Sequence, residues 1–204
     1  MKTRDIRVLV TILAVVFLSS AGGYLAFRYS ETMGPVVGSD GNEVGGRFRL
    51  MDASDGTMSD RDFRGRWMLV LFGATHCYEQ ACDKTLNTLS KALKTIDPDG
   101  KKTVPMFLSL DPLRDSSERL RQYALRFPAK IVAGTGAPAN IAAVAKEFYA
   151  PIVKHPDPEW DYTFEMSPQI VVMNPQGHYA GLISSSASAD EIRTRLETMM
   201  SLPR

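Results

Sequence analysis

Apolar positions along this chain follow two patterns: short continuous runs, and positions three or four residues apart. The runs 67–74 and 103–111 are typical of strands that are buried on both faces of a sheet. Between them, apolar residues at helical spacing precede the stop signal Pro98-Asp99-Gly100, and these are Leu86, Leu89, Leu93 and Ile96. The pattern therefore predicts a strand, a helix and a second strand in this part of the chain.

The alternation continues with shorter elements, and a hairpin lies on either side of it. The later periodic segments predict a short strand at 129–136 and helices at 116–126, 137–149 and 188–200. Hairpins are expected at 47–59 and at 168–184. Because strands that alternate with helices are joined by right-handed crossovers, we expect an α/β sandwich, with a central mixed β-sheet and helices on both faces.

The N-terminus adds a different kind of segment. Residues 1–7 contain Lys2, Arg4 and Arg7, and residues 8–27 contain no charged side chain. Twenty helical residues span about 30 Å, the thickness of a bilayer core. The basic residues before this segment predict that the N-terminus stays inside and the rest of the chain is exported. The alternative is a cleaved signal peptide, because Ser19-Ser20-Ala21 resembles a cleavage site.

These patterns predict how the chain is organised. After the basic N-terminus (1–7) and the transmembrane anchor or uncleaved signal (8–27), the linker 28–46 is rich in Gly, Ser and Pro, and the domain covers 47–204. The composition is 44% apolar and 23% charged, and the net charge is +1. Such a balance is ordinary for a globular protein and gives no reason to expect nucleic-acid binding.

Both cysteines of the chain, Cys77 and Cys82, lie directly after the first long strand. Nearby thiols form disulfides in an oxidising compartment, but a bridge over so short a loop constrains the unfolded chain little. We therefore interpret the pair as reactive or metal-binding. A redox pair between a buried strand and a helix is the thioredoxin arrangement, in which we expect Cys77 near the helix N-terminus, where the dipole favours the thiolate.

The spacing of the two cysteines restricts where they can lie. Five helical steps place them about 140° apart around the axis and about 7.5 Å apart along it. That rise exceeds the usual disulfide Cα separation of at most about 7 Å. If the pair acts together, Cys77 must lie in a loop before the helix, or the first turn must contain a π-like bulge. The alternative is that one cysteine is a spectator.

Several segments in the same order resemble the Sco/SenC family of membrane-anchored, thioredoxin-like copper chaperones of cytochrome oxidase assembly. They are "GGRFRLMDASDG", "DFRGRWMLVLFGATHC", "FLSLDPLRDSSERLRQY", "IVAGTGAPANIAAVAKEF" and "VVMNPQG". The resemblance covers about Gly46 to Leu202. It implies a copper site made of two cysteines and a histidine, with three residues between the cysteines.

This chain departs from the family pattern at two places. "CYEQAC" has four intervening residues, and Met166 stands where the resemblance implies the histidine. A site of Cys77, Cys82 and Met166 contains only sulfur donors, which favour Cu(I). Met166 can equally be a core residue, since methionine often fills gaps in cores. Of the other candidates, His76 adjoins Cys77 but is not the family's main ligand. His155 lies in a long loop that could fold over the site, although a solvated loop histidine is the favoured interpretation.

The segment that matches the family's Asp-Pro-x-Arg-Asp motif contains three more charged residues of interest. Asp111 follows a buried strand, where it can either tune the thiols or simply form a turn. Arg114 and Asp115 are expected to form a local pair.

The resemblance implies a metallochaperone that holds Cu(I) through Cys77 and Cys82 and passes it to a membrane cuproprotein, such as a cytochrome oxidase subunit. The implied location is an inner membrane, crossed once, with the domain in the periplasm or the mitochondrial intermembrane space. A second hypothesis is a thiol–disulfide oxidoreductase, in which Cys77 attacks and Cys82 resolves. A third is a peroxide sensor that uses Cys77 as a sulfenic-acid site.

Overall fold

The structure is a computed structural model and describes residues 44–201. The basic segment 1–7, the predicted membrane segment 8–27 and most of the linker 28–46 lie outside this range. The last linker residues contact the domain: the Gly45 amide donates to the Glu147 carbonyl at 2.7 Å. None of the helices within 44–201 has the length and apolar character to span a bilayer.

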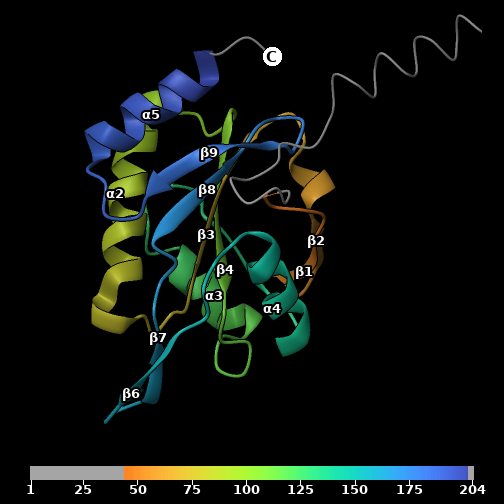
Figure 1. The fold of residues 1–204 in the computed structure, drawn as a ribbon, viewed down its shortest axis with the longest axis vertical. Coiled ribbons are helices and arrows are strands. Elements are labelled where there is room, and N and C mark those ends of the chain that lie inside the picture. Colours follow the sequence, from red (N-terminus) through yellow and green to blue (C-terminus); the bar gives the residue numbers. More distant parts are fainter. Residues whose placement is uncertain (1–43, 202–204) are drawn as a thin grey trace, which may run out of the picture. The chain divides into compact units, whose positions relative to one another are not determined.

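Seven strands form one central sheet in the order β2-β1-β5-β4-β3-β8-β9 (Figure 1). The three inner strands β3, β4 and β5 are parallel, whereas β1, β2, β8 and β9 are joined by antiparallel pairings. Their bounds are Arg49–Asp52 (β1), Thr57–Ser59 (β2), Trp67–Gly73 (β3), Thr103–Ser109 (β4), Val132–Thr135 (β5), Gln169–Met173 (β8) and Tyr179–Ser184 (β9). The predicted mixed sheet is confirmed.

The two longest apolar runs form the centre of the sheet because they are buried on both sides. All residues of β3 and β4 are buried. Side chains of β3 alternate between two core clusters, so that Leu69 and Leu71 belong to one and Val70 and Phe72 to the other. This alternation is what a continuous apolar run in a covered parallel sheet requires.

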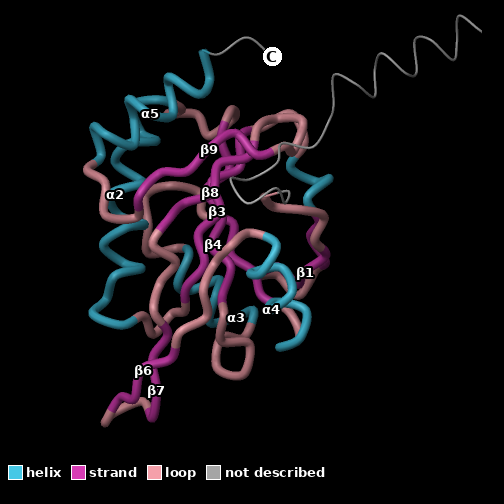
Figure 2. Tube along the Cα trace, viewed as in Figure 1, coloured by secondary structure: helices cyan, strands magenta, loops and turns pink. Residues whose placement is uncertain are grey.

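Helices cover both faces of this sheet, as the periodicity predicted (Figure 2). One core cluster includes side chains of α2, α3 and α5, and the other includes side chains of α4. The bounds are Ala81–Ile96 (α2), Ser117–Ala124 (α3), Pro138–Glu147 (α4) and Ala189–Ser201 (α5). Two short 3-10 turns, η1 (Asp60–Phe63) and η2 (Tyr78–Gln80), precede β3 and α2.

Local signals account for several element ends. Ser116 accepts a hydrogen bond from the Arg119 amide and caps α3. Ser188 and Glu191 form a reciprocal capping box before α5. In the β8–β9 hairpin, the Asn174 carboxamide oxygen accepts from the amides of Gln176 and His178. Both predicted hairpins are therefore confirmed.

One element was not predicted. Residues 154–164, which were expected to form a loop, contain a second, two-stranded sheet formed by β6 (Lys154–Asp157) and β7 (Asp161–Phe164). Its sequence hides it, because Pro156 and several charged residues interrupt any apolar alternation. The Asp157 carboxylate closes the turn by accepting from the amides of Glu159 and Trp160. The β6–β7 hairpin projects from the lower end of the domain in Figure 1.

Candidate metal and redox site

Cys77 and Cys82 lie at the carboxyl end of β3, where ligand and redox sites of open α/β sheets form. Cys77 has an extended backbone and precedes the η2 turn, and Cys82 is the second residue of α2. The structure therefore confirms the prediction that Cys77 lies in a loop before the helix. Cys82 lies in the first turn of α2, and Cys77 lies near the same helix N-terminus, with 5.8 Å between the two Cα atoms.

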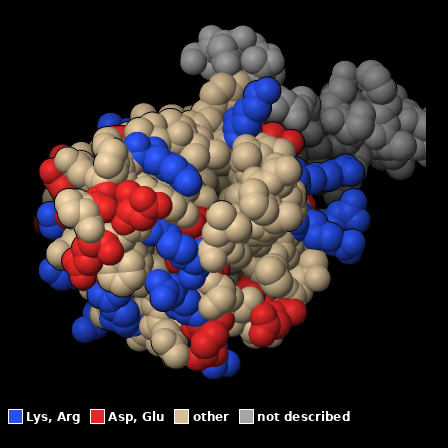
Figure 3. Space-filling model, turned by 90° about the horizontal axis from the view of Figure 1, so that it is seen from below, with Lys and Arg blue, Asp and Glu red and all other residues tan. Residues whose placement is uncertain are grey.

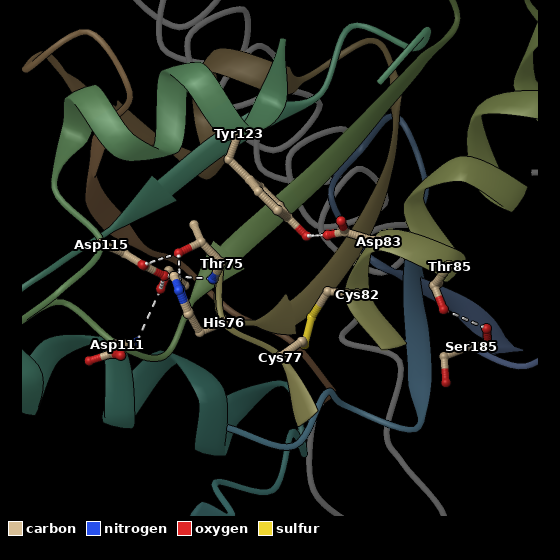
Figure 4. The surroundings of a disulfide bond; sticks show 11 residues. Thr75, His76, Cys77, Cys82, Asp83, Thr85, Asp111, Asp115, Tyr123 and Ser185 are labelled. Carbon is tan, nitrogen blue, oxygen red and sulfur yellow. Dashed lines mark hydrogen bonds between the residues drawn. A yellow bond between two sulfur atoms is a disulfide. The ribbon is translucent and has the colours of Figure 1, made fainter. Parts of the chain in front are cut away.

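The residues between the cysteines take an uncommon backbone conformation. Glu79 and Gln80 have φ values of 52° and 56°, in the left-handed region. These two residues reverse the direction of the chain before α2 begins, and the Cα atoms of Cys77 and Cys82 lie only 5.8 Å apart. The structure joins the two sulfurs in a disulfide (Figure 4). The left-handed turn therefore absorbs the additional residue of "CYEQAC".

Left-handed conformations cost about 1–2 kcal/mol for residues with a Cβ and almost nothing for glycine. We expect the double substitution Glu79→Gly, Gln80→Gly to stabilise the oxidised turn by about 2 kcal/mol, which corresponds to a reduction potential about 40 mV more negative. Equilibration with glutathione buffers measures the potential. The control Asp99→Gly, in an exposed loop, should leave it unchanged, and a less negative potential in the double variant would contradict the argument.

The two sulfurs are unequally accessible. Cys82 is fully buried and Cys77 is 9% exposed. Gly73, the last residue of β3, lies beneath the disulfide: a Cβ there would overlap Cys82 Sγ and would lie 3.3 Å from Cys77 Sγ. Both cysteines therefore lie in the core, and Cys77 keeps the greater residual exposure of the two.

Gly73→Ala should prevent the disulfide from closing without displacement, because the neighbouring atoms are sulfurs held by the sheet and by α2. We expect at least half of the variant to retain two free thiols under air, as counted with a thiol reagent after denaturation. Gly100→Ala, at a loop glycine far from the cysteines in sequence, serves as the control. Complete oxidation of the Gly73 variant at the wild-type rate would show that the site tolerates the methyl group.

The loop before Cys77 is held by a buried carboxylate. Asp115 is 1% exposed and accepts hydrogen bonds from the Thr75 amide at 2.9 Å, the Thr75 hydroxyl at 2.5 Å and the Ser109 hydroxyl at 2.5 Å (Figure 4). The expected Arg114–Asp115 pair is wrong, because the Asp115 carboxylate turns inward toward Thr75. Asp115 therefore joins Ser109, the last residue of β4, to Thr75, which lies two residues before Cys77.

Arg114 binds the β6–β7 hairpin instead. Its guanidinium pairs with Asp111, lies 3.8 Å from the Tyr162 ring centroid and donates to the Trp160 carbonyl at 2.8 Å. The Tyr162 hydroxyl also donates to Asp111 at 3.1 Å. Of the two roles considered for Asp111, the structure shows a turn residue that also positions the hairpin through Arg114 and Tyr162.

The hairpin covers both neighbours of Cys77. The His76 and Trp160 rings are tilted by 59° with centroids 3.8 Å apart, and Tyr78 stacks on His155 at 4.3 Å. His155 also contacts the Glu165 carboxylate at 3.1 Å. The expectation of a solvated loop histidine is therefore wrong: His155 is half-buried, belongs to β6 and lies beside the cysteine turn.

Met166 follows this hairpin and lies on the same side as the cysteines. Phe164 forms an isolated β-bridge with Cys77, and the Ser167 amide donates to the Phe72 carbonyl at 2.9 Å. Met166 is half-buried against the core cluster that contains both cysteines. It also lines a groove of about 640 Å³ together with Tyr78. The fold therefore brings the three predicted sulfur residues to one region.

Two neighbouring rings keep their neutral forms at neutral pH. Partial burial lowers the pKa of His76, and the cations Arg119 and Arg114 lower it further. Burial raises the pKa of Tyr123, and so does its hydrogen bond to Asp83, which follows Cys82 (Figure 4). Tyr123 therefore remains a hydrogen-bond donor that ties α3 to the first turn of α2. Within 44–201, no three His, Cys, Asp or Glu side chains converge as a metal site.

A family model described as SCO1/SenC matches residues 37–201. The chain belongs to the SCO1/SenC family. "Protein SCO1 homolog 1, mitochondrial" from Arabidopsis thaliana is 26% identical over 149 residues, which cover 73% of this chain and 45% of the relative. The chain spans about half the length of the curated relatives that it matches.

Solved SCO1/SenC structures share the fold. The crystal structure of Arabidopsis thaliana ScoI with copper bound has a TM-score of 0.72 and 26% identity, and the likeness covers 77% of this chain and 98% of that one. The structure of Bradyrhizobium japonicum ScoI with copper bound has a TM-score of 0.68 and 28% identity, and the likeness covers 76% of this chain and 99% of that one. The α/β fold of this protein is therefore thioredoxin-like, with a mixed central sheet.

The sequence patterns did not predict the roles of several residues at this site. Asp115 was singled out but given the wrong partner, and Thr75 and Trp160 were not singled out at all. The signal for Asp115 was present, since it lies within six residues of the end of the buried strand β4, near a site that opens there. No local pattern marks Trp160, because its partner His76 lies far away along the sequence and the two meet only in the fold.

Proposed function

We propose that this SCO1/SenC protein is a membrane-anchored copper chaperone that holds Cu(I) through Cys77 and Cys82 and delivers it during the assembly of cytochrome oxidase or another cuproprotein. The placement of both cysteines and of the Met166 segment at the same end of the sheet carries the proposal. The domain would face the periplasm or the mitochondrial intermembrane space, attached by the segment 8–27.

The donor set fits the cargo. Reduction of the disulfide takes two electrons and two protons from a dithiol and leaves two thiols, which lose their protons when they bind metal. Thiolates and a thioether are soft ligands and select Cu(I) over harder ions. Met166 is the third ligand in this proposal, because it lies in the groove beside the cysteine turn. Cu(II) would be bound less tightly, since no imidazole takes part.

Met166→Ala should lower the affinity for Cu(I) by about 10–100-fold, less than the loss of a cysteine, because it removes a neutral thioether and leaves both thiolates in place. The affinity is measured by competition with a chromophoric Cu(I) chelator, on the reduced full-length chain. Disulfide exchange of the cysteines should remain within about twofold of wild type, because neither sulfur is removed.

The control for this variant is Met200→Ala, a half-buried methionine near the end of α5, far from the hairpin in Figure 1. It should bind Cu(I) as wild type does. Equal Cu(I) affinity in the Met166 variant would remove the thioether from the site and leave a site of two cysteines. Equal tight binding of Cu(I) and Cu(II) by wild type would also count against a site made only of sulfur.

A second candidate function rests on the unequal exposure of the cysteines. An attacking thiol that is more accessible than the resolving thiol is the arrangement that a thiol–disulfide oxidoreductase needs. Cys77 would attack a partner disulfide and form a mixed disulfide, and Cys82 would then displace the partner as a dithiol. The two functions are compatible, because copper binds only to a partner whose cysteines are reduced.

A further inference from the structure

Exposed apolar side chains occur at the hairpin end of the domain, and two of them, Tyr78 and Trp160, lie beside Cys77 or its neighbour His76. Five of them are 38% exposed or more, and we call them the apolar face: Tyr78, Leu113, Ile152, Val153 and Trp160. Figure 3 views this end of the molecule from below and shows a broad uncharged area, with acidic and basic side chains around it. Contiguous exposed apolar area on a soluble domain usually marks a site of interaction.

The members of this face are continuous with the site. Trp160 packs against His76, and Tyr78 stacks on His155. These two ring contacts join the hairpin to the cysteine turn. Leu113 and Ile152 line a common groove of about 210 Å³. Tryptophan and tyrosine are also the residues most enriched at the energetic centres of protein interfaces. A partner that reaches Cys77 would therefore contact this face first.

Carboxylates outnumber cations in the two segments beside the apolar face, and the nearby Arg114 is already paired with Asp111. The two segments next to Cys77, residues 76–82 and 152–166, contain one lysine and five carboxylates, which are Glu79, Asp157, Glu159, Asp161 and Glu165. The lysine, Lys154, lies 3.7 Å from the Tyr162 ring centroid. Among the described residues, Glu165 is the only one of the five carboxylates with an ion-pair partner, His155. This excess of carboxylates is suited to a basic partner.

We propose that the apolar face binds an extended, cysteine-bearing segment of a partner protein whose flanking residues are apolar and basic. The inference rests on the proposed function in one respect, the exchange of a sulfur or a metal between Cys77 and the partner. The apolar flanks would cover Trp160 and Ile152, and basic side chains would neutralise the unpaired carboxylates of the hairpin. This arrangement would bring the partner's sulfur to Cys77, the more exposed of the two cysteines.

Three synthetic peptides test this recognition, each carrying one cysteine as a mixed disulfide with thionitrobenzoate. Their sequences are Lys-Leu-Cys-Leu-Lys, Glu-Leu-Cys-Leu-Glu and Lys-Ser-Cys-Ser-Lys. The Cys77 thiolate attacks the peptide sulfur, the peptide–thionitrobenzoate bond breaks and coloured thionitrobenzoate leaves. Cys82 then displaces the peptide thiol and closes the disulfide. Rates with the reduced full-length chain are divided by rates with dithiothreitol, which removes intrinsic differences between the peptides.

We expect the Lys/Leu peptide to react at least about tenfold faster than either comparison peptide, with an advantage over the Glu peptide that shrinks as salt rises. Ile152→Ser and Trp160→Ser should remove the advantage over the Ser peptide. Glu159→Gln with Asp161→Asn should remove the advantage over the Glu peptide. Neutral hydroxyethyl disulfide reports the reactivity of Cys77 itself and should react equally with all variants. If Trp160→Ser changes the rate with hydroxyethyl disulfide, the peptide preference of Ile152→Ser is the deciding measurement, because Ile152 takes no part in the ring contacts with His76 and Tyr78.

Equal normalised rates for the three peptides would overturn the docking surface, and so would a preference for the Glu peptide. Neither result would affect copper binding, which is measured separately by the Cu(I) competition. Conversely, a chain that binds no Cu(I) but prefers the Lys/Leu peptide would refute the chaperone and leave the surface established. The two proposals therefore fail independently.

Discussion

Cys82→Ser will lower the affinity of the reduced protein for Cu(I) by more than about 100-fold. Loss of a group that only supports a ligand already costs about 10–100-fold, and this change removes a ligand itself. Cys77→Ser should have an effect of the same size, because the proposal gives both thiolates to the metal. Chelator competition under anaerobic conditions measures both variants. Wild type with its disulfide intact is the matched control and should bind no Cu(I).

The same two variants separate the redox function from the chaperone function. In Cys82→Ser the Cys77 thiol can attack a disulfide but cannot be released, so a mixed disulfide should accumulate. In Cys77→Ser the remaining thiol is fully buried and should react slowly. Wild-type Cu(I) affinity in either variant would mean that the corresponding cysteine is a spectator.

Asp115→Ala will destabilise the domain by about 3 kcal/mol. The substitution leaves two hydroxyls and the Thr75 amide without their acceptor, and each unsatisfied buried donor costs about 1–3 kcal/mol. Urea denaturation followed by circular dichroism measures the free energy of unfolding. The loop that leads to Cys77 should also lose protection from hydrogen exchange, since Asp115 holds it to β4.

The exposed carboxylate Asp99 provides the control for this variant. Asp99→Ala should change the free energy of unfolding by less than about 0.5 kcal/mol, as is usual for surface substitutions. If Asp115→Ala proves no more destabilising than Asp99→Ala, the buried network contributes little and Cys77 must be held by the hairpin contacts alone.

The elements of the main sheet and its helices were predictable because each has a local signature. A continuous apolar run indicates β3, and leucines at helical spacing indicate α2. The spacing of the cysteines predicted either a loop position for Cys77 or a π-like bulge, because a regular helix cannot bring residues five apart within reach of one another, and the structure shows the loop. Residue spacing alone, with no knowledge of contacts, was sufficient for these conclusions.

The remaining features depend on contacts between distant parts of the chain. Thr75 and Asp115 are 40 residues apart, and Arg114 and Trp160 are 46 apart. Periodicity reports burial within one element and says nothing about which loops meet at the end of a sheet. The β6–β7 hairpin packs by stacking rings and cations rather than by aliphatic burial, so its strands show no apolar alternation.

The left-handed turn between the cysteines has a consequence for how the site changes state. On one side, Asp115 fixes Thr75, and on the other, Tyr123 and Arg126 hold Asp83 in the first turn of α2. Any change in the separation of the two sulfurs, on reduction or on binding a metal, must therefore be absorbed by Tyr78, Glu79 and Gln80. These three residues therefore link two fixed segments, and because Tyr78 belongs to the apolar face, a change in the state of the cysteines would also change that part of the surface offered to a partner.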